Sequence, residues 1–340
     1  MRAISYSRTG DPDVLTLTER PEPQPGPGEV AVRIHRSGLN PTDVKSRRGS
    51  DSGKPVDPPQ VPGQDGAGIV ESMGAGVEAA LSGLRVWIWE AAWQRPDGTS
   101  QELAVVPARH VVTLPDSASF DLGASLGIPF LTAHRCLTIG EEAPRRLGPG
   151  SMSGRTVLVA GGAGAVGNAA IQLARWSDAR VITTVSSPQK AQLAAAAGAD
   201  NVIDYRQQDV VTEVRKIVPH GVDAIVEVAP AANAAIDAEL IGQHGAVAMY
   251  ADDGGGQITL PIRTLMVPNA RWQFVLVYTE PDAAKARALE DVQAAVLDGA
   301  IRVGDEAGLP LHHFPLEQAA QAHAAVENGA VGKVLIDVLD

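Results

Sequence analysis

The sequence predicts an α/β protein in which one domain is a doubly wound parallel sheet and another is rich in β-strands. Its 340 residues exceed the usual length of a single domain. Residues 127–267 alternate short apolar strands with alanine-rich helices, and this order requires parallel strands joined by helical crossovers. Residues 1–126 show short strands and turns instead, and residues 268–340 return to a mixture of helix, turn and strand.

Residues 1–126 carry the signals of a β-rich segment. Val30, Val32 and Ile34 recur with a period of two, which indicates a half-buried strand. Proline and glycine cluster before this strand, at residues 21–28, and after it, at residues 55–63. Such clusters predict loops between strands.

The central segment contains five predicted strands, which are Thr156–Ala160, Arg180–Val185, Asn201–Ile203, Ala224–Val228 and Ala246–Tyr250. Composition predicts helices at Val166–Trp176 and Pro188–Ala197, each placed between two of these strands. The last segment is predicted to hold helices Asp282–Leu297 and Leu316–Asn328 and a closing strand, Lys333–Val338. Before them, Arg271–Tyr278 is a β-prone run that we expect either at a sheet edge or buried inside the chain.

Charge and composition exclude several classes of function. The formal net charge of −12 argues against nucleic acid as a partner, because that affinity rests on clustered Lys and Arg. No apolar run approaches the ~18 residues of a membrane span, and Met1–Leu15 has no signal-peptide core, so we expect a cytoplasmic protein without a membrane partner. The single cysteine, Cys136, excludes an internal disulfide and any zinc site built on several thiolates.

The segment Ala160-Gly161-Gly162-Ala163-Gly164-Ala165-Val166-Gly167 follows an apolar strand and opens a predicted helix. In that context a glycine pattern predicts a dinucleotide site rather than a purely structural turn. Gly162 and Gly164 would let the backbone turn and approach a pyrophosphate, and Gly167 would let the helix pack on the strand. The phosphates would then lie at the helix N-terminus.

The end of the second central strand favours NADPH over NADH. An NAD site places Asp or Glu ~20 residues beyond the glycines. Here the strand ends in Val185-Ser186-Ser187-Pro188-Gln189-Lys190, and the only acidic residues between Gly167 and Asn201 are Asp178 and Asp200, which lie outside it. Hydroxyls with the Lys190 ammonium suit a 2′-phosphate, and Tyr205-Arg206 ends the next strand beside them.

Further segments carry a resemblance to a known family along almost the whole chain. They are Ser37-Gly38-Leu39-Asn40-Pro41-Thr42-Asp43, the run from Pro62 to Val70, Leu131-Thr132-Ala133, the run from Val185 to Lys190, Phe314-Pro315-Leu316 and Gly332-Lys333-Val334. In order and spacing they resemble the quinone oxidoreductase (zeta-crystallin-like) branch of the medium-chain dehydrogenases/reductases.

The resemblance implies a GroES-like catalytic domain, residues 1–126 with 268–340, around a Rossmann domain, residues 127–267. It implies that Asn40 and Thr132 lie near the nicotinamide. By the same resemblance Ser186, Lys190 and Tyr205 would lie near the 2′-phosphate, Lys333 would belong to the cofactor region, and two subunits would pair their sheet edges in a homodimer.

Two departures from relatives bear on the chemistry. Zinc-dependent relatives carry a Gly-His-Glu where this chain reads Gly63-Gln64-Asp65, and they use several cysteines, so no metal is expected here. Within the quinone reductase branch, a tyrosine is common where this chain has Lys45. Lys45 therefore either contacts a different substrate or is a surface substitution.

Without zinc, we expect hydride transfer to a quinone or an electron-poor C=C bond, because the charge spreads onto an oxygen that hydrogen-bond donors stabilise. The candidate donors are Asn40, Lys45, Thr132 and His134. Trp87, Trp89 and Trp93 either line a pocket for a flat substrate or pack the β-rich core. The alternatives are an enone or enoyl-thioester reductase of a biosynthetic pathway, and an NADPH-binding redox sensor with little turnover.

Overall fold

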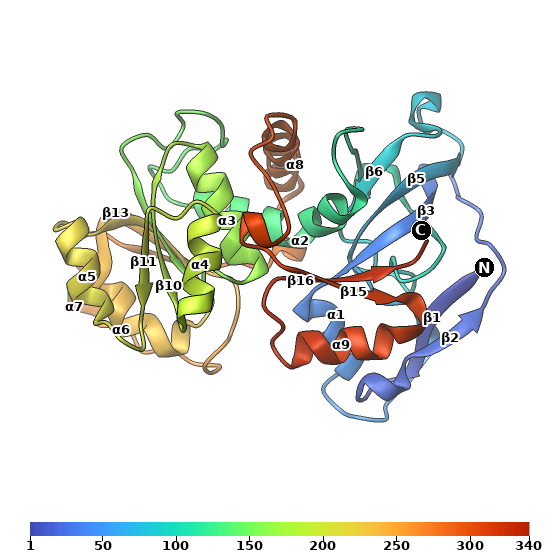
Figure 1. The fold of residues 1–340 in the computed structure, drawn as a ribbon, viewed down its shortest axis with the longest axis horizontal. Coiled ribbons are helices and arrows are strands. Elements are labelled where there is room, and N and C mark those ends of the chain that lie inside the picture. Colours follow the sequence, from blue (N-terminus) through green and yellow to red (C-terminus); the bar gives the residue numbers. More distant parts are fainter. Residues whose placement is uncertain (340) are drawn as a thin grey trace. The chain divides into compact units, whose positions relative to one another are not determined.

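The computed structural model describes residues 1–339, which form two compact units. One unit comprises Met1–Ile128 and the chain from Leu311 onward, and the other comprises Pro129–Pro310. Both ends of the chain therefore lie in the same unit (Figure 1). The predicted α/β class, with one parallel sheet and one β-rich unit, is confirmed.

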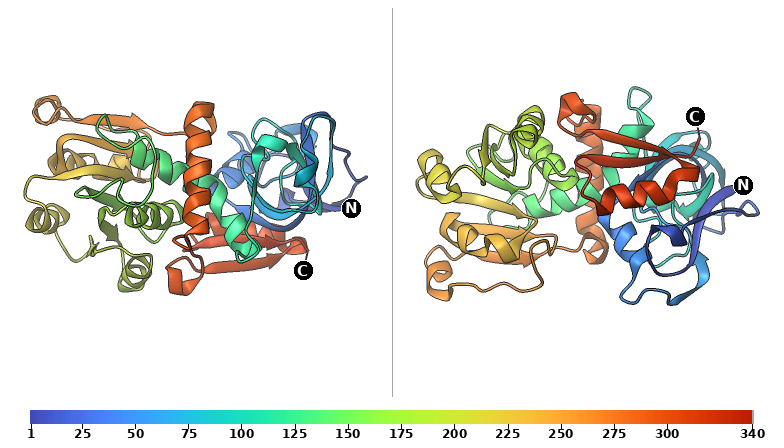
Figure 2. Two further views of the ribbon diagram at one scale, coloured as in Figure 1. Left: turned by 90° about the horizontal axis from the view of Figure 1, so that it is seen from above. Right: turned by 60° about the horizontal axis from the view of Figure 1, so that its bottom comes forward.

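The first unit is built mainly from strands. Its elements are β1 (Arg2–Arg8), β2 (Thr16–Glu19), β3 (Glu29–Leu39), α1 (Pro41–Arg48), β4 (Pro55–Gln60), β5 (Asp65–Met73), β6 (Arg85–Ile88), β7 (Leu103–Pro107), β8 (Val111–Thr113), the start of α2 (Phe120–Thr138), β15 (Leu311–Pro315), α9 (Ala319–Glu327) and β16 (Lys333–Asp337), with 3-10 turns at Pro12–Val14, Ala79–Leu81, Ala108–His110 and Leu316–Gln318. A seven-stranded sheet runs in the order β15-β16-β3-β5-β6-β8, with β7 also paired to β3. Figure 2 shows α9 running beside β15 and β16.

Strand β3 buries one face completely over Val30–Ile34, as its alternation predicted, and the other face in part. Val30, Val32 and Ile34 lie in the main core of the unit with no exposed surface. Ala31, on the opposite face, is also fully buried and packs with Leu103 of β7. Arg33 and His35, farther along the same face as Ala31, are only partly buried.

The second proline cluster contains a strand where the sequence predicted only loops. Strand β4 spans Pro55–Gln60 and pairs antiparallel with β1, at the edge of a three-stranded sheet ordered β2-β1-β4. Proline lacks the amide hydrogen that a central strand needs, but an edge strand tolerates it because one side of the strand has no neighbour.

The second unit contains β9 (Thr156–Ala160), α3 (Ala165–Trp176), β10 (Arg180–Val185), α4 (Pro188–Ala196), β11 (Asn201–Asp204), α5 (Val210–Ile217), β12 (Val222–Glu227), α6 (Pro230–Leu240), β13 (Ile241–Met249), α7 (Ile262–Met266), β14 (Arg271–Phe274) and α8 (Asp282–Leu297), with 3-10 turns at Val277–Thr279 and Asp305–Ala307. All strand pairs of its six-stranded sheet are parallel, in the order β11-β10-β9-β12-β13-β14. Two βαβ halves that meet at the first strand give this order, which is that of a Rossmann sheet.

Helices cover both faces of this sheet. Val210 and Val214 of α5, Leu240 of α6 and apolar strand residues form one core, against which Leu265 of α7 packs. Helices α3 and α4 lie on the other side (Figure 1). Because the crossovers bring helices to both faces, the strands are apolar throughout, and this is why composition alone located β9 and β10.

The expected domain boundary at residue 268 is wrong, because residues 268–310 belong to the second unit. Strand β14 pairs with β13 and completes the parallel sheet, and α8 packs against α3. The first unit resumes only at Leu311. Of the predicted segment 268–340, Asp340 lies outside the described residues. Within residues 1–339, we find no helix with the length and apolar character of a membrane span.

Candidate functional site

The glycine segment forms the tight turn between β9 and α3 in the second unit. The turn requires glycine at Gly161 because its φ is +69°, and it requires glycine at Gly162 because β10 approaches closely there. A Cβ on Gly162 would lie 2.1 Å from Thr183 Oγ1 of β10. A Cβ on Gly167 would lie 2.4 Å from the Gly161 carbonyl oxygen, so this glycine lets α3 pack on the turn.

Helix α3 begins at Ala165, with Gly164 as its N-cap. The amides of its first turn, Ala165 to Gly167, have no acceptor within the helix, and the dipole makes this end positive. The turn also lies at the carboxyl end of β9, where open parallel sheets bind ligands. Glycines without side chains, free amides and this position together fit a pyrophosphate.

Four predicted side chains lie at the adjoining carboxyl ends of β10 and β11. Lys190 Nζ donates to Ser186 Oγ at 3.2 Å, and both side chains are partly exposed. Ser187 is the N-cap of α4, and its Oγ accepts from Lys190 N at 3.3 Å. Tyr205 is 51% exposed and its amide donates to the Val185 carbonyl, which brings the end of β11 beside Ser186.

In the first unit, Asn40 and Lys333 belong to one buried network. Asn40 is the N-cap of α1, in a capping box with Asp43. Asn40 Nδ2 donates to Asp65 Oδ2 at 2.7 Å, and Lys333 Nζ donates to Asn40 Oδ1 at 2.9 Å. The Asn40 backbone is extended, with φ −125°, so this asparagine is not there to relieve an unusual backbone angle. Lys333 is 1% exposed, and we therefore propose that it orients Asn40 instead of contacting a cofactor.

Asp65 is the centre of this network. Its Oδ2 lies 3.3 Å from Lys333 Nζ, and its Oδ1 accepts from the amide of Ile128 at 2.9 Å. A Cβ on Gly127 would lie 2.0 Å from Oδ1, so glycine is required where α2 breaks and the carboxylate approaches. Burial raises the pKa of Asp65, while Lys333 and Asn40 oppose the rise. Burial lowers the pKa of Lys333.

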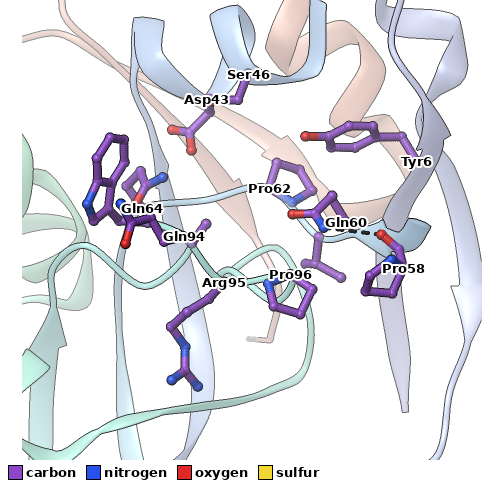
Figure 3. A pocket seen from close by; sticks show the side chains of 13 residues that line it. Tyr6, Asp43, Ser46, Pro58, Gln60, Pro62, Gln64, Gln94, Arg95 and Pro96 are labelled. Atoms are coloured by element: carbon purple, nitrogen blue, oxygen red, sulfur yellow. Dashed lines mark hydrogen bonds between the residues drawn. The ribbon is translucent and has the colours of Figure 1, made fainter. Parts of the chain in front are cut away.

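Asp43 connects this network to a cavity of about 400 Å³ that lies wholly within the first unit. Asp43 Oδ2 accepts from Asn40 N at 2.8 Å, and Oδ1 accepts from Gly63 N at 3.1 Å. Figure 3 shows the Asp43 carboxylate and the Tyr6 hydroxyl pointing toward the same space. Burial, with a contribution from Asp65, raises the pKa of Asp43 to about 7. Burial and Asp43 raise the pKa of Tyr6 to about 12.

The remaining predicted residues have different surroundings. Lys45 is exposed on α1, and Thr132 is 6% exposed on the part of α2 that belongs to the second unit. His134 uses its Nε2 inside the second unit. Its Nε2 lies 2.7 Å from Asp291 Oδ2, which also accepts from the amide of Leu147 at 2.7 Å, and this contact joins α2 to α8 inside the unit.

The three tryptophans divide between the two alternatives. Trp87 is fully buried, and Trp89 stacks on His110 at 4.5 Å between ring centroids, so both pack the β-rich core. Trp93 lines the cavity, together with Gln60, Gln64 and Gln94. Sequence reasoning did not single out Asp43, Asp65 or Gln64 as site residues, although all three lie in segments that carried the family resemblance.

Cys136 is buried in the second unit, and burial raises the pKa of its thiol, which keeps it a neutral thiol and a poor metal ligand. Over residues 1–339 no group of three or more His, Cys, Asp or Glu side chains is arranged to hold a metal ion.

Comparison with known proteins shows similarity over the whole chain. The family model described as "Alcohol dehydrogenase GroES-like domain" matches residues 26–116, in the β-rich unit, and "Zinc-binding dehydrogenase" matches residues 165–294. The quinone oxidoreductase of Lama guanicoe is 31% identical over 342 residues, which cover 99% of this chain and 97% of the relative.

Two solved structures have the same fold over their full length. An NAD-dependent alcohol dehydrogenase is 29% identical, with a TM-score of 0.84 and coverage of 100% of both chains. A mycobacterial protein complexed with NADPH is 29% identical, with a TM-score of 0.81 and coverage of 99% of both chains. Because these two differ in cofactor, the shared fold does not decide between NADH and NADPH. The side chains at the end of β10 must therefore decide the cofactor preference.

Proposed function

The chain belongs to the quinone oxidoreductase family of the medium-chain dehydrogenases/reductases, and we propose that it reduces a quinone or an activated C=C bond with NADPH and without zinc. It is an oxidoreductase. The observation that carries the cofactor assignment is the glycine turn before α3, with Ser186 and Lys190 at the end of the next strand. The cytoplasm remains our prediction for its location.

NADPH is the favoured cofactor because of charge at the end of β10. When bound, it supplies a hydride at the nicotinamide. Gly161–Gly167 would receive the pyrophosphate on free backbone amides, and Ser186, Ser187, Lys190 and Tyr205 would surround the 2′-phosphate. No carboxylate stands at the end of β10, where an NAD site would place one against the ribose hydroxyls.

We expect Lys190→Ala to weaken NADPH at least tenfold while it leaves NADH unchanged. A hydrogen bond to a charged group contributes about 1.5–3 kcal/mol, and only the phosphate of NADPH would lose it. Titration calorimetry with both cofactors measures this. Equal losses for the two cofactors, or a wild-type preference for NADH, would contradict the assignment.

Several features support a reaction without zinc. The chain has one cysteine, which is buried and neutral, and Gln64 stands where zinc-dependent relatives carry a histidine. A quinone or enone needs less polarisation than a ketone, because its conjugation spreads the charge that hydride transfer creates. We propose that Asn40, Lys45 and Thr132 border the reacting groups, with Asn40 oriented by Asp65 and Lys333.

The cavity beside Asp43 is the proposed substrate site. Its volume of about 400 Å³ falls in the range of about 300–1,000 Å³ that is usual for small-molecule pockets. Trp93 gives it an aromatic wall, and the glutamines and Tyr6 give it polar groups. A flat, neutral carbonyl compound fits this combination.

A panel of quinones, enones and enoyl thioesters, with NADPH oxidation followed at 340 nm before and after exhaustive chelation, tests the proposal. We expect turnover of quinones or enones and no loss on chelation. Turnover confined to enoyl thioesters would favour the biosynthetic alternative. NADPH binding with no oxidation by any compound would favour a redox sensor, and activity restored only by zinc would overturn the metal-free chemistry.

We also propose a homodimer that pairs β14 edges. Strand β14 is the edge of the parallel sheet, and Phe274 and Leu276 are 68% and 53% exposed there, while Val275 and Val277 are buried in the same chain. Ile262, Met266 and Val267, in and next to α7, add exposed apolar surface. An apolar edge of this kind is a liability unless it is covered.

We expect Phe274→Asp to convert the dimer to a monomer. A carboxylate at the centre of a two-fold interface faces its own copy, so burial and like-charge repulsion act together. Light scattering at micromolar concentration measures the mass. Leu17→Asp, which changes an exposed leucine of β2 in the other unit, is the matched control and should stay dimeric. A monomeric wild-type protein would contradict the proposal.

A further inference from the structure

A second cavity, of about 280 Å³, lies wholly within the second unit. Three arginines from three segments line it, namely Arg135 near the end of α2, Arg145 in the loop before β9 and Arg287 of α8. Ala143 is the apolar side chain of a wall whose other side chains are polar or charged. A wall that is so polar and so rich in arginine predicts a small anionic ligand.

The arginines with a structural role beside this cavity are paired with carboxylates. Arg146 lies 2.6 Å from Asp291 Oδ1 and 2.7 Å from Glu290 Oε2. Arg135 Nε, in the wall itself, lies 2.7 Å from Glu280 Oε2 in an ion pair, although this buried N–H is not aligned for a hydrogen bond. Carboxylates are plentiful, because the chain has 40 Asp and Glu against 28 Lys and Arg. An arginine without a carboxylate is therefore the exception that needs a reason.

Arg145 and Arg287 are that exception, because neither has an ion-pair partner within residues 1–339. Arg287 is half-buried on α8, and Arg145 is exposed. Glu141, the carboxylate of the wall, is already paired with Arg271. Two unpaired cations on one cavity repel each other, and an anion between them would replace that repulsion with attraction.

This cavity is separate from the expected cofactor site. Glu141 of its wall pairs with Arg271, the first residue of β14. The glycine turn follows the last residue of β9, and Ser186 follows the last residue of β10. Because all strands of this sheet are parallel, their first and last residues lie at opposite edges. Bound NADPH would therefore leave the arginines of this cavity unoccupied.

We propose that Arg145 and Arg287, with Arg135 in the same wall, form a second anion site that binds a phosphoryl group. The planar guanidinium matches phosphate oxygens with two parallel hydrogen bonds. A phosphoryl group carries a charge of about −1.5 to −2 and can accept from both unpaired arginines, whereas a carboxylate has a single charge to share. The volume is slightly below the usual range of about 300–1,000 Å³ for small-molecule pockets, which suits a phosphate ion or a small phosphate ester. This site does not depend on the function proposed above.

Equilibrium dialysis of inorganic phosphate against the full chain tests the proposal. The protein is saturated with NADPH, which fills the cofactor's own phosphate positions, and the buffer has low salt because salt screens exposed charges. We expect the wild type to bind phosphate more tightly than acetate, and Arg145→Gln and Arg287→Gln to bind phosphate at least tenfold more weakly. Phosphate should raise the melting temperature of the wild type more than that of either variant. The affinity for NADPH should be the same in all three proteins.

Arg180→Gln is the matched control, because Arg180 is an exposed arginine of the same unit that lies outside the cavity wall. It should bind phosphate as the wild type does. Three results would overturn the proposal: an equal loss of affinity in Arg180→Gln, no binding by the wild type at millimolar phosphate, and equal affinity of the wild type for acetate and phosphate.

Ribose 5-phosphate identifies the source of the phosphoryl group, because it carries the same group on an organic body. Tighter binding of the ester than of inorganic phosphate would identify a phosphorylated metabolite as the ligand. Tighter binding of inorganic phosphate would identify the free ion. In either case the affinity should fall in Arg287→Gln, and an ester that binds this variant as well as the wild type would contradict the site.

Discussion

Replacing Lys333 by methionine should lower the free energy of unfolding by about 3–5 kcal/mol, the usual cost of breaking a buried ion pair. Lys333 and Asp65 are 1% and 0% exposed and lie 3.3 Å apart. Methionine fills similar space but leaves the Asp65 carboxylate without its cation in a site that water does not reach. Denaturant titration of wild type and variant measures the loss.

The double variant Lys333→Met with Asp65→Asn separates charge from packing. It removes both charges, and the Asn40 amide, no longer held by Lys333, can turn its oxygen toward the new amide at position 65. We expect it to be more stable than Lys333→Met alone. If the Lys333→Met variant unfolds at the same denaturant concentration as the wild type, the Lys333–Asp65 pair is not ionised. The network then holds Asn40 by neutral hydrogen bonds instead.

Local sequence patterns were sufficient to predict an element where each residue's environment comes from its neighbours in sequence. Strands β9 and β10 and helix α8 have the predicted bounds, because apolar β-branched runs and an uninterrupted helical composition carry their own signal. The glycine turn was identifiable for the same reason. The helices α1, α5 and α6 were not predicted. They are short, and tertiary packing contributes more to the stability of a short helix than its own composition does.

Local patterns failed where the deciding partner is far away in sequence. Lys333 and Asn40 are 293 positions apart, and His134 and Asp291 are 157 apart. The sequence shows a lysine and a histidine but not that each is buried against a specific acceptor. Segment 268–310 was misplaced for the same reason: only the pairing of β14 with β13 assigns it to the parallel sheet.

A second buried group should make stability depend on pH. Asp237 of α6 is 1% exposed and faces Glu227 at the end of β12. Glu227 accepts from Asn233 Nδ2 at 3.1 Å and from the amide of Ala229. Burial, followed by the charge of Glu227 and the hydrogen bond to it, raises the pKa of Asp237 from 3.8 to about 9. At neutral pH Asp237 is therefore protonated and donates to Glu227.

The sign of the pH effect follows from this proton. Below pH 3.8 both the folded and the unfolded chain carry it. Between 3.8 and about 9 the folded chain keeps the proton while the unfolded chain releases it, so stability falls as pH rises. One proton corresponds to about 1.36 kcal/mol for each pH unit, or about 4 kcal/mol between pH 5 and pH 8.

Asp237→Asn should abolish this dependence, because the amide donates to Glu227 at every pH and does not titrate. Relative to wild type, the variant should gain about 4 kcal/mol of unfolding free energy between pH 5 and pH 8. Taking the difference between two proteins cancels the histidines and the carboxyls outside the Asp237–Glu227 pair, which titrate alike in both. Tyr250, whose pKa burial raises, stays neutral throughout this range. Asp116→Asn, at an exposed aspartate, is the control and should follow the wild-type curve. Parallel curves for wild type and Asp237→Asn would mean that Asp237 is ionised in the folded protein and that its proton is not shared with Glu227.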